Sequence, residues 1–289
     1  MALKLLCLTG FSWALIFALL SRVNCKRFGP CQIFRANLFL SRSKLLLKEI
    51  HHVNILAIDT SDARGSVAAR TNGQSAQVLQ HQSTEDYSSW LLPAVDILLR
   101  NVGTSLADTS VLAVSTGPGS FTGLRVGLTA VKAWAEVYGS SVVGISRLEA
   151  MASRIAIDGL IASCYDAQRG HVFGGIYERA GSSLTPLEKE MVTSPAEFWA
   201  LVNSVANAKS TQSVSWISLD PALITALPAW ESRQDVGDTM LRCHGDIARS
   251  ILELGAQRAA AKSFTDPLLL DANYVRRSDA EIFWKDPHN

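Results

Sequence analysis

Two segments of the chain share one pattern, and this repeat limits the possible folds more than any other feature. They are NILAIDTSDARGSVAAR (residues 54–70) and LIASCYDAQRGHVFGGIY (residues 160–177). Each consists of an apolar strand, an aspartate, a short turn, Arg-Gly and a second β-rich strand, so Asp59 corresponds to Asp166. Self-similarity of this kind indicates an internal duplication.

The predicted elements of the first half give a mixed α/β sheet. Three strands come first, with an Asn72-Gly73 hairpin signal between the second and third, followed by alternating helices and strands. We expect strands over 53–61, 64–70, 75–82, 111–115 and 141–146, and helices over 87–102, from about 121 to 138, and from 147 onward. Two copies of a β-β-β-α-β-α unit are typical of the actin/sugar-kinase (ASKHA) superfamily.

The second half is less regular. Helices are expected over 194–206 and 244–260 and a strand over 214–220, whereas the tail from residue 266 has no clear period. We therefore predict an α/β protein with two actin-like lobes and mixed sheets. The first lobe covers residues 53–155, and a smaller second lobe with the C-terminal tail covers residues 156–289.

Residues 1–52 form a leader with its own charge pattern. They hold eight basic side chains and one acidic one, whereas the remaining residues hold 19 basic and 25 acidic ones. Residues 5–20 resemble the apolar region of a signal peptide and are short for a membrane span. The alternative, which we favour, is a misplaced start codon, with Val53 as the true start because GTG is a common bacterial alternative.

The charge and the cysteine content of residues 53–289 argue against several classes of protein. The acidic balance of this part makes it a poor candidate for gripping a nucleic-acid backbone by itself. Cys164 and Cys243 are far apart and form no CxxC, which argues against a disulfide framework or a cysteine metal site. We expect a cytoplasmic protein without stable membrane association.

The stretch from Ser115 to Gly139 places Gly-Pro-Gly-Ser between a strand and a helix. Such a turn suits an anion, because glycines let the backbone approach a phosphate and free amides at the helix start point outward. Ser120 or Thr122 would otherwise cap the helix internally, and the residues favour neither interpretation. No Lys-Ser/Thr follows, so this is not a Walker A loop. The candidate nucleotide- or anion-binding residues are Asp59, Thr60, Ser61, Gly117, Gly119, Ser120 and Thr122.

The helix after this turn carries small residues on one face. Gly123 and Gly127 lie one turn apart, and Ala130 and Trp134 continue the face. Small residues let a neighbour come close, and that neighbour is either the chain's own sheet or another subunit. The candidate partner-interface residues are Trp90, Gly123, Gly127, Ala130 and Trp134.

Four motifs carry a specific resemblance. ILAIDTS, LLPAVDILL, GPGSFTGLRVGLTAVKAWA and VVGISRLEAMA, in this order and at these distances, resemble the bacterial TsaB (YeaZ-type) family, which serves the threonylcarbamoylation of a tRNA adenosine beside the anticodon. The resemblance is strong over residues 55–152 and weaker at DAQRGHVFGGIY and DPLLLDANYVRR. It implies a heterodimer with the catalytic paralog TsaD, action with the ATPase TsaE, and contact with tRNA through the complex. It also implies ATP or ADP only in the assembled complex, and a homodimer as an alternative state of the isolated chain.

The resemblance further implies an inactive relative of TsaD. That paralog carries a metal-binding His-x-x-x-His directly after the equivalent of VVGIS, where this chain has Arg147 and Met151. Arginine has no lone pair, and a thioether prefers soft metals. We therefore expect no metal, no stoichiometric cofactor and no catalytic residue. One departure is Asp86-Tyr87-Ser88, where the family commonly has His-Ser.

Two enzyme classes remain as alternatives. A sugar-kinase-like phosphotransferase needs a catalytic carboxylate, for which Asp59 and Asp166 are candidates, but both fit better as turn formers at strand ends. A glycopeptidase-type hydrolase needs a metal or a nucleophile–base pair, and the sequence offers neither. A signal-bearing envelope protein is the third alternative, if the leader is a signal.

The leader hypothesis has a direct test. A chain that begins at Val53 is expected to fold and to complement loss of the endogenous gene, because residues 1–52 have no place in the predicted lobes. The misplaced start would be contradicted if only the full-length chain complemented the loss, or if mass spectrometry placed the N-terminus of the native protein near Met1.

Overall fold

The computed structural model describes residues 53–71, 74–82 and 85–275. The leader and the Asn72-Gly73 turn predicted above lie outside the described residues. Every strand and helix predicted within the first lobe is present, and the strand bounds agree closely. Within the described residues, no helix is both long enough and apolar enough to cross a membrane.

The first sheet has five strands in the order β3-β2-β1-β4-β5. Its central strand β1 pairs antiparallel with β2 and parallel with β4. The outer pairs are β2 with β3, antiparallel, and β4 with β5, parallel. The strands are β1 (Ile55–Asp59), β2 (Ser66–Arg70), β3 (Gln77–Gln80), β4 (Val111–Gly117) and β5 (Ser141–Ser146).

The second sheet repeats this arrangement. Its order is β11-β10-β6-β7-β8, with β9 pairing β7 beside β8. Strand β6 is antiparallel to β7 and parallel to β10, as β1 is to β2 and β4. The same order and directions in both sheets confirm the duplication inferred from sequence. The strands are β6 (Gly159–Gln168), β7 (His171–Ala180), β8 (Ser183–Pro186), β9 (Met191–Thr193), β10 (Val214–Ser218) and β11 (Thr239–Arg242).

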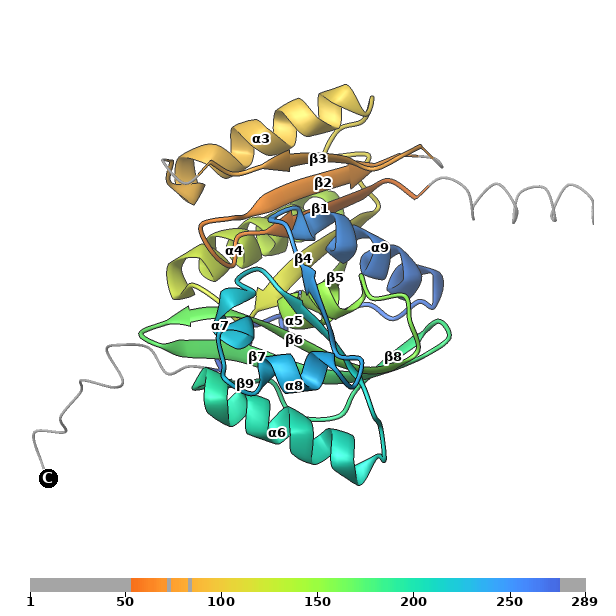
Figure 1. Ribbon diagram of the computed structural model, residues 1–289. Helices are drawn as coiled ribbons and strands as arrows, with labels where there is room; N and C mark the ends of the chain where they lie inside the picture. The colour runs from red at the N-terminus through yellow and green to blue at the C-terminus, as the bar shows by residue number, and fades with distance from the viewer. Residues whose placement is uncertain (1–52, 72–73, 83–84, 276–289) are drawn as a thin grey trace, which may run out of the picture. The chain divides into compact units, whose positions relative to one another are not determined.

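The helices complete five layers (Figure 1). Helices α3 (Tyr87–Asn101) and α4 (Phe121–Tyr138) cover one face of the first sheet, and their buried side chains form one core with it. Helices α5 (Arg147–Ala152) and α9 (Ile247–Ala260) lie between the sheets in a second core. Helices α6 (Pro195–Ala208), α7 (Ala222–Thr225) and α8 (Trp230–Gln234) cover the far face of the second sheet.

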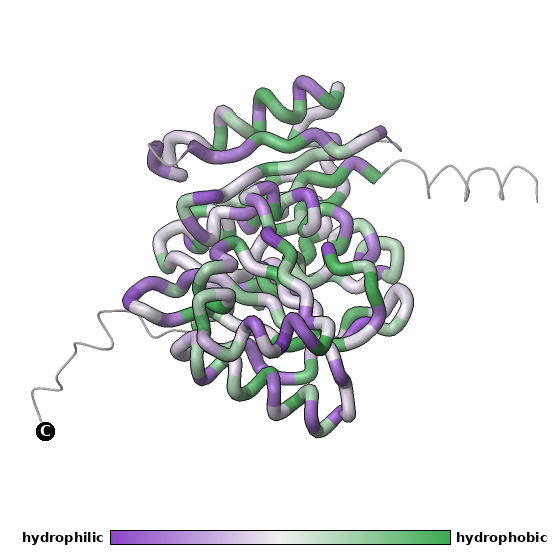
Figure 2. Tube along the Cα trace, viewed as in Figure 1, coloured by the Kyte–Doolittle hydropathy of each residue, from purple (hydrophilic) through white to green (hydrophobic). Residues whose placement is uncertain are grey.

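Hydropathy follows these layers. The central strands are mostly hydrophobic, whereas α3 and α6 alternate between hydrophobic and hydrophilic residues (Figure 2), as expected for helices with one buried face. Helix α9 comes late in the sequence but packs chiefly on β1 and β4 of the first sheet. The C-terminal part of the chain therefore helps to build the first lobe.

Helix α4 lies unusually close to the end of β1. A Cβ atom at Gly123 would lie 2.1 Å from the carbonyl oxygen of Thr60, and one at Gly127 would lie 2.5 Å from Thr60 Oγ1. Both glycines are buried. The neighbour that requires small residues on this helix is therefore the chain's own first lobe at both positions.

This close approach predicts different costs for two alanine substitutions. Gly123→Ala is expected to lower the free energy of unfolding by about 1–3 kcal/mol, because the new methyl group meets a backbone atom. Gly127→Ala should cost less, because the Thr60 side chain can rotate and alanine improves helix propensity by about 1 kcal/mol. Urea unfolding of the full chain measures both.

The matched control is Ala133→Gly on the exposed side of α4, which should lose only helix propensity. A Gly123→Ala variant as stable as the unaltered chain would contradict the close approach.

Candidate functional site

A cleft of about 900 Å³ lies between the two lobes. The turn after β1 and the Gly-Pro-Gly-Ser loop after β4 line it from the first lobe. The end of β6 and Asp220, two residues beyond the end of β10, line it from the second. Because the carboxyl ends of these strands meet at the cleft, this is where an α/β fold of this type would place a ligand. Its charged lining residues are Asp62, Arg64, Asp166 and Asp220.

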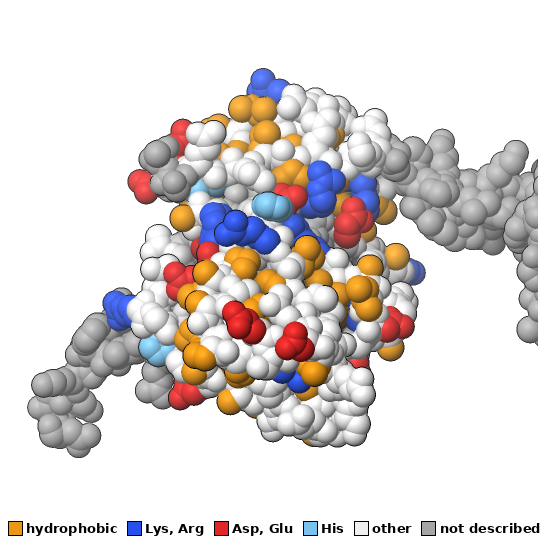
Figure 3. Space-filling model, viewed as in Figure 1, with side chains coloured by type: hydrophobic (Ala, Val, Ile, Leu, Met, Phe, Trp, Pro, Cys, Tyr) orange, Lys and Arg blue, Asp and Glu red, His pale blue; other side chains and the backbone are white. Residues whose placement is uncertain are grey.

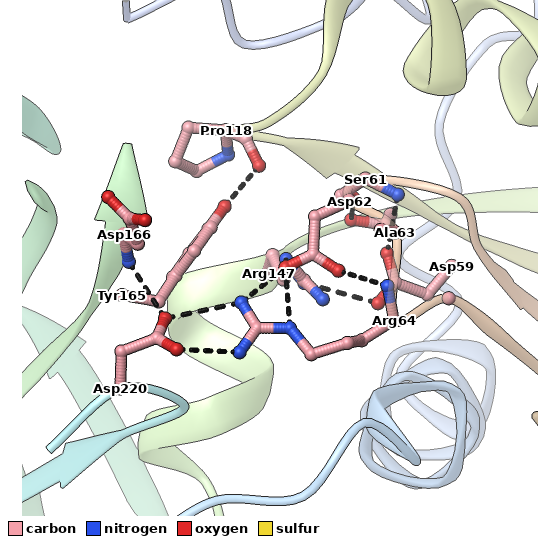
Figure 4. Close-up of polar contacts among 12 residues, drawn as sticks. Asp59, Ser61, Asp62, Ala63, Arg64, Pro118, Arg147, Tyr165, Asp166 and Asp220 are labelled. Carbon is pink, nitrogen blue, oxygen red and sulfur yellow. Dashed lines mark hydrogen bonds and ion pairs between the residues drawn. The ribbon is translucent and has the colours of Figure 1, made fainter. Parts of the chain in front are cut away.

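A fully buried arginine lies behind this cleft (Figure 4). The Nε of Arg147 donates to Asp59 Oδ2 at 3.1 Å, and its Nη1 lies 2.8 Å from Asp62 Oδ2. Its guanidinium carbon lies 4.7 Å from the centre of the Tyr165 ring. Burial by itself lowers the pKa of Arg147, but the charges of Asp59 and Asp62 outweigh it and raise that pKa above its usual value. Arg147 is therefore a permanent internal cation.

Arg64 joins the two lobes across the mouth of the cleft (Figure 4). Its Nη2 donates to Asp62 Oδ2 at 2.8 Å, and its Nη1 donates to Asp220 Oδ1 of the second lobe at 2.8 Å. Asp220 Oδ2 also accepts from the backbone amide of Asp166 at 3.0 Å. Burial raises the pKa of Asp62, but Arg147 and Arg64 outweigh it and hold that pKa well below its usual range.

The two aspartates of the sequence repeat play the same structural part. Asp59 Oδ1 accepts from the amide of Ser61 at 3.0 Å, and Asp166 Oδ1 accepts from the amide of Gln168 at 2.7 Å. Both side chains thus bond the backbone two residues on, as in Asx turns. The prediction that they form turns at strand ends is confirmed.

The predicted anion-binding residues are largely engaged inside the fold. Asp59, Thr60 and Ser61 are buried, and Ser61 Oγ lies 2.7 Å from Ser115 Oγ. Ser120 Oγ accepts from the amide of Gly123 at 3.3 Å, which is the capping interpretation, and Ser120 N donates to Ser61 O at 2.6 Å. Gly119 and Ser120 line the cleft, Gly117 lies in β4 behind them, and Thr122 is exposed.

The charge of the cleft does not suit a nucleotide phosphate. Asp62, Asp166 and Asp220 all line it, and the guanidinium of Arg64 is already shared between two of them. A phosphate would meet carboxylates first. Anion binding at the Gly-Pro-Gly-Ser loop stays a prediction, and we assign no chemistry to it.

The predicted interface residues divide into two groups. Gly123 and Gly127 are buried against Thr60, as described above, so they are not part of an open surface. Trp90, Ala130 and Trp134 are half-buried at the outer edge of the first core. Partner binding by these three stays a prediction.

The departure at Tyr87 has a structural role. Its hydroxyl donates to the carbonyl of Asp62 and accepts from the amide of Gly65 at 2.8 Å. Its ring stacks on His81 with 4.2 Å between ring centres. Tyr87 therefore holds the turn that carries Asp62 and Arg64, a role that a polar pattern in the sequence does not reveal.

The positions compared with the histidine pair of the paralog lie in the interior. Arg147 and Met151 are both fully buried. Within the described ranges, no group of three or more His, Cys, Asp or Glu side chains has the arrangement of a metal site. The residues present therefore do not fit a divalent metal at this place, since its first position holds a cation already.

The duplicated sheets and the cleft between them define a two-lobed protein of the actin/sugar-kinase class. The family model described as TsaD, tRNA N6-adenosine threonylcarbamoyltransferase, matches residues 76–266. The chain belongs to this family, and within it to the TsaB (YeaZ-type) proteins.

Individual relatives agree with this assignment. The chain is 35% identical over 128 residues to the tRNA threonylcarbamoyladenosine biosynthesis protein TsaB of Bacillus subtilis, covering 44% of this chain and 56% of the relative. It is 33% identical over 130 residues to TsaB of Escherichia coli, with the same coverage. The aligned region thus spans little more than half of each relative. YeaZ from Pseudomonas aeruginosa has the same fold, with a TM-score of 0.63 at 22% identity over 77% of this chain and 99% of that one.

Arg147 provides a test of the buried charge network. Arg147→Met is expected to lower the free energy of unfolding by about 3–5 kcal/mol, because it leaves buried Asp59 without its cation. Arg147 also lowers the pKa of Asp62, so Asp62 contributes stability above its unfolded pKa and loses it as the pH falls through the folded value. In the variant this acid loss should begin at a higher pH, as chemical unfolding at stepped pH would measure.

Two further variants control this test. Arg147→Lys keeps the charge and should retain part of the stability. Arg100→Gln removes an exposed ion pair with Asp96 and should cost at most about 1 kcal/mol. Equal stability of Arg147→Met and the unaltered chain at pH 7 would contradict the role given to Arg147.

Proposed function

We propose that this chain is a non-catalytic partner subunit needed for threonylcarbamoyl transfer to the adenosine beside the anticodon of ANN-decoding tRNAs. It would act with TsaD as a heterodimer and with the ATPase TsaE, and it would contact tRNA through that complex. Its membership of the TsaB (YeaZ-type) proteins supports the pathway.

The strongest support for a non-catalytic role is the state of the cleft. The place compared with the metal-binding histidines holds Arg147, which is bonded to Asp59 and Asp62. The cleft itself presents carboxylates that are bonded to Arg64. Groups committed to these internal contacts are poor general bases, because Asp62 stays ionised far below neutral pH and holds its proton weakly.

A partner surface is available on the outer helices of the first lobe. Leu92 and Ile97 on α3 are 57% and 51% exposed, and Val137 at the end of α4 is 71% exposed. Half-buried Trp90 and Trp134 belong to the same two helices. Figure 3 shows hydrophobic side chains over the part of the molecule where α3 lies. Aromatic and aliphatic side chains of this kind serve as anchors when a second protein covers them.

This proposal predicts the effect of charge on that surface. Leu92→Asp combined with Val137→Asp should leave the melting temperature nearly unchanged, because both side chains already face solvent. It should abolish co-purification with TsaD and lower threonylcarbamoyladenosine in tRNA, measured by mass spectrometry of nucleosides from a strain that depends on this chain.

The matched control is Ile157→Asp combined with Val236→Asp, which places the same two charges at 68% and 50% exposed positions outside α3 and α4. It should retain both TsaD binding and the modification. Normal modification with the doubly substituted chain would refute this surface as the partner site. Unchanged modification after deletion of the gene would refute the function itself.

A further inference from the structure

A second cavity of about 670 Å³ lies away from the interlobe cleft and is lined by arginines. One exposed face of α9, the segment after α5 and the β7–β8 hairpin enclose it. We call it the α9 groove. Its charged lining residues are Arg154, Arg179, Arg249, Arg258, Glu149, Asp246 and Glu253.

The three carboxylates of the groove are each committed to an arginine. Asp246 Oδ1 lies 2.9 Å from Arg154, and Glu149 Oε1 lies 2.5 Å from Arg258. Glu253 pairs at 2.8 Å with Arg70 of β2, which is not part of the lining. An arginine from outside thus neutralises the third carboxylate.

Two arginines of the lining are left without a close carboxylate among the described residues. Arg179 donates only to backbone carbonyls, those of Ser153 at 3.1 Å and Gly181 at 3.4 Å. Its Nε is buried and has no hydrogen-bond partner in the described chain. Arg249 comes no closer than 4.0 Å to Asp246, which Arg154 already binds, and its side chain is half exposed.

We propose that the α9 groove binds a phosphate group through Arg179 and Arg249. Arg179 has no carboxylate partner among the described residues, and Arg249 has only a 4.0 Å contact with a carboxylate that Arg154 already binds. Together they provide several N–H donors and excess positive charge, which is what a phosphate's oxygens require. This charge is local, because acidic side chains outnumber basic ones in residues 53–289. Binding of phosphate in this groove would therefore not be explained by the overall charge of the protein.

The phosphate has two possible sources with the same chemistry. One is the backbone of an RNA, and this source rests on the proposed function, in which tRNA is the substrate of the complex. The other is a small phosphorylated molecule, for which a cavity of this volume has room. The groove lies on a different part of the fold from the apolar α3 and α4 surface, so both contacts are compatible.

The test uses the full-length chain with Arg179→Gln combined with Arg249→Gln. Its matched control is Arg100→Gln combined with Arg242→Gln, which removes the same charge at exposed positions on α3 and β11. Inorganic phosphate is titrated by calorimetry. A tRNA is titrated by fluorescence anisotropy at several salt concentrations.

The unaltered chain and the control are expected to bind phosphate, and the groove variant to lose this binding. If RNA is the source, the groove variant should also bind tRNA about tenfold more weakly than the control. Its salt dependence should then fall by about one to two in logarithmic slope. Loss of phosphate binding with unchanged tRNA binding assigns the groove to a small phosphorylated molecule.

Three results would overturn the phosphate site. In the first, the groove variant and the control bind phosphate equally well. In the second, the unaltered chain binds neither phosphate nor tRNA. In the third, the groove variant no longer co-purifies with TsaD but still binds phosphate and tRNA. The last would assign the groove to carboxylates of a partner protein. None of these readouts requires the modification reaction, so failure of the proposed function is seen separately.

Discussion

The buried ion pairs of Arg147 are the interaction on which the centre of this molecule depends. Arg147 is the first residue of helix α5, in the layer between the sheets. Its guanidinium group contacts Asp59 at the end of β1, Asp62 in the following turn and the ring of Tyr165 on β6. A buried ion pair contributes little net stability, because desolvation offsets the attraction. Removing one partner is nevertheless costly, so these ion pairs fix the turn after β1 against helix α5, and the contact of Arg147 with the Tyr165 ring extends the network to the second lobe.

The same network decides what the cleft is able to do. In a fold of this class the turn after β1 is placed to meet a ligand, but here its charges are compensated by Arg147 from behind and by Arg64 from the front. Arg64 also bonds Asp220, and Tyr165 donates its hydroxyl hydrogen to the carbonyl of Pro118, so both lobes are tied across the cleft. Opening of the cleft would break these contacts.

Local patterns in the sequence predict much of the fold. The strand–Asp–turn–strand repeat predicts β1, β2, β6 and β7, and it also predicts the Asx turns of Asp59 and Asp166. Ser194-Pro195 with Glu197 predicts the start of α6, where the structure has a full capping box. These features depend on neighbours within a few residues, which is why sequence periodicity and cap signals suffice.

Features that depend on distant residues were not predicted. The short elements β8, β9, β11, α7 and α8 have weak local signals and depend on packing against β7 and β10. The position of α9 on the first sheet joins segments more than 100 residues apart. The burial of Arg147 also could not be predicted from the sequence, since an arginine after a strand is usually at the surface. One signal for the cleft was present, because Asp220 is the last residue of a predicted strand.

The tail after α9 shows how an irregular segment acquires a specific place. Thr265 bridges to Val142 of β5, and the amide of Asn273 donates to Thr116 O at 2.7 Å. The side-chain amide of Asn273 donates to Glu190 Oε2 at 2.5 Å, and Ser146 and Tyr177 donate to the other oxygen of the same carboxyl group.

Burial raises the pKa of Glu190, and these three donors only partly oppose it. The charged carboxylate is therefore costly to bury, and its contribution to stability declines as the pH rises through its folded pKa. Each donor reduces that cost, and they come from β5, β7 and the tail. The tail thus helps to solvate a charge that the two lobes share, and this gives the non-periodic segment around DANY a defined position without a helix or strand of its own.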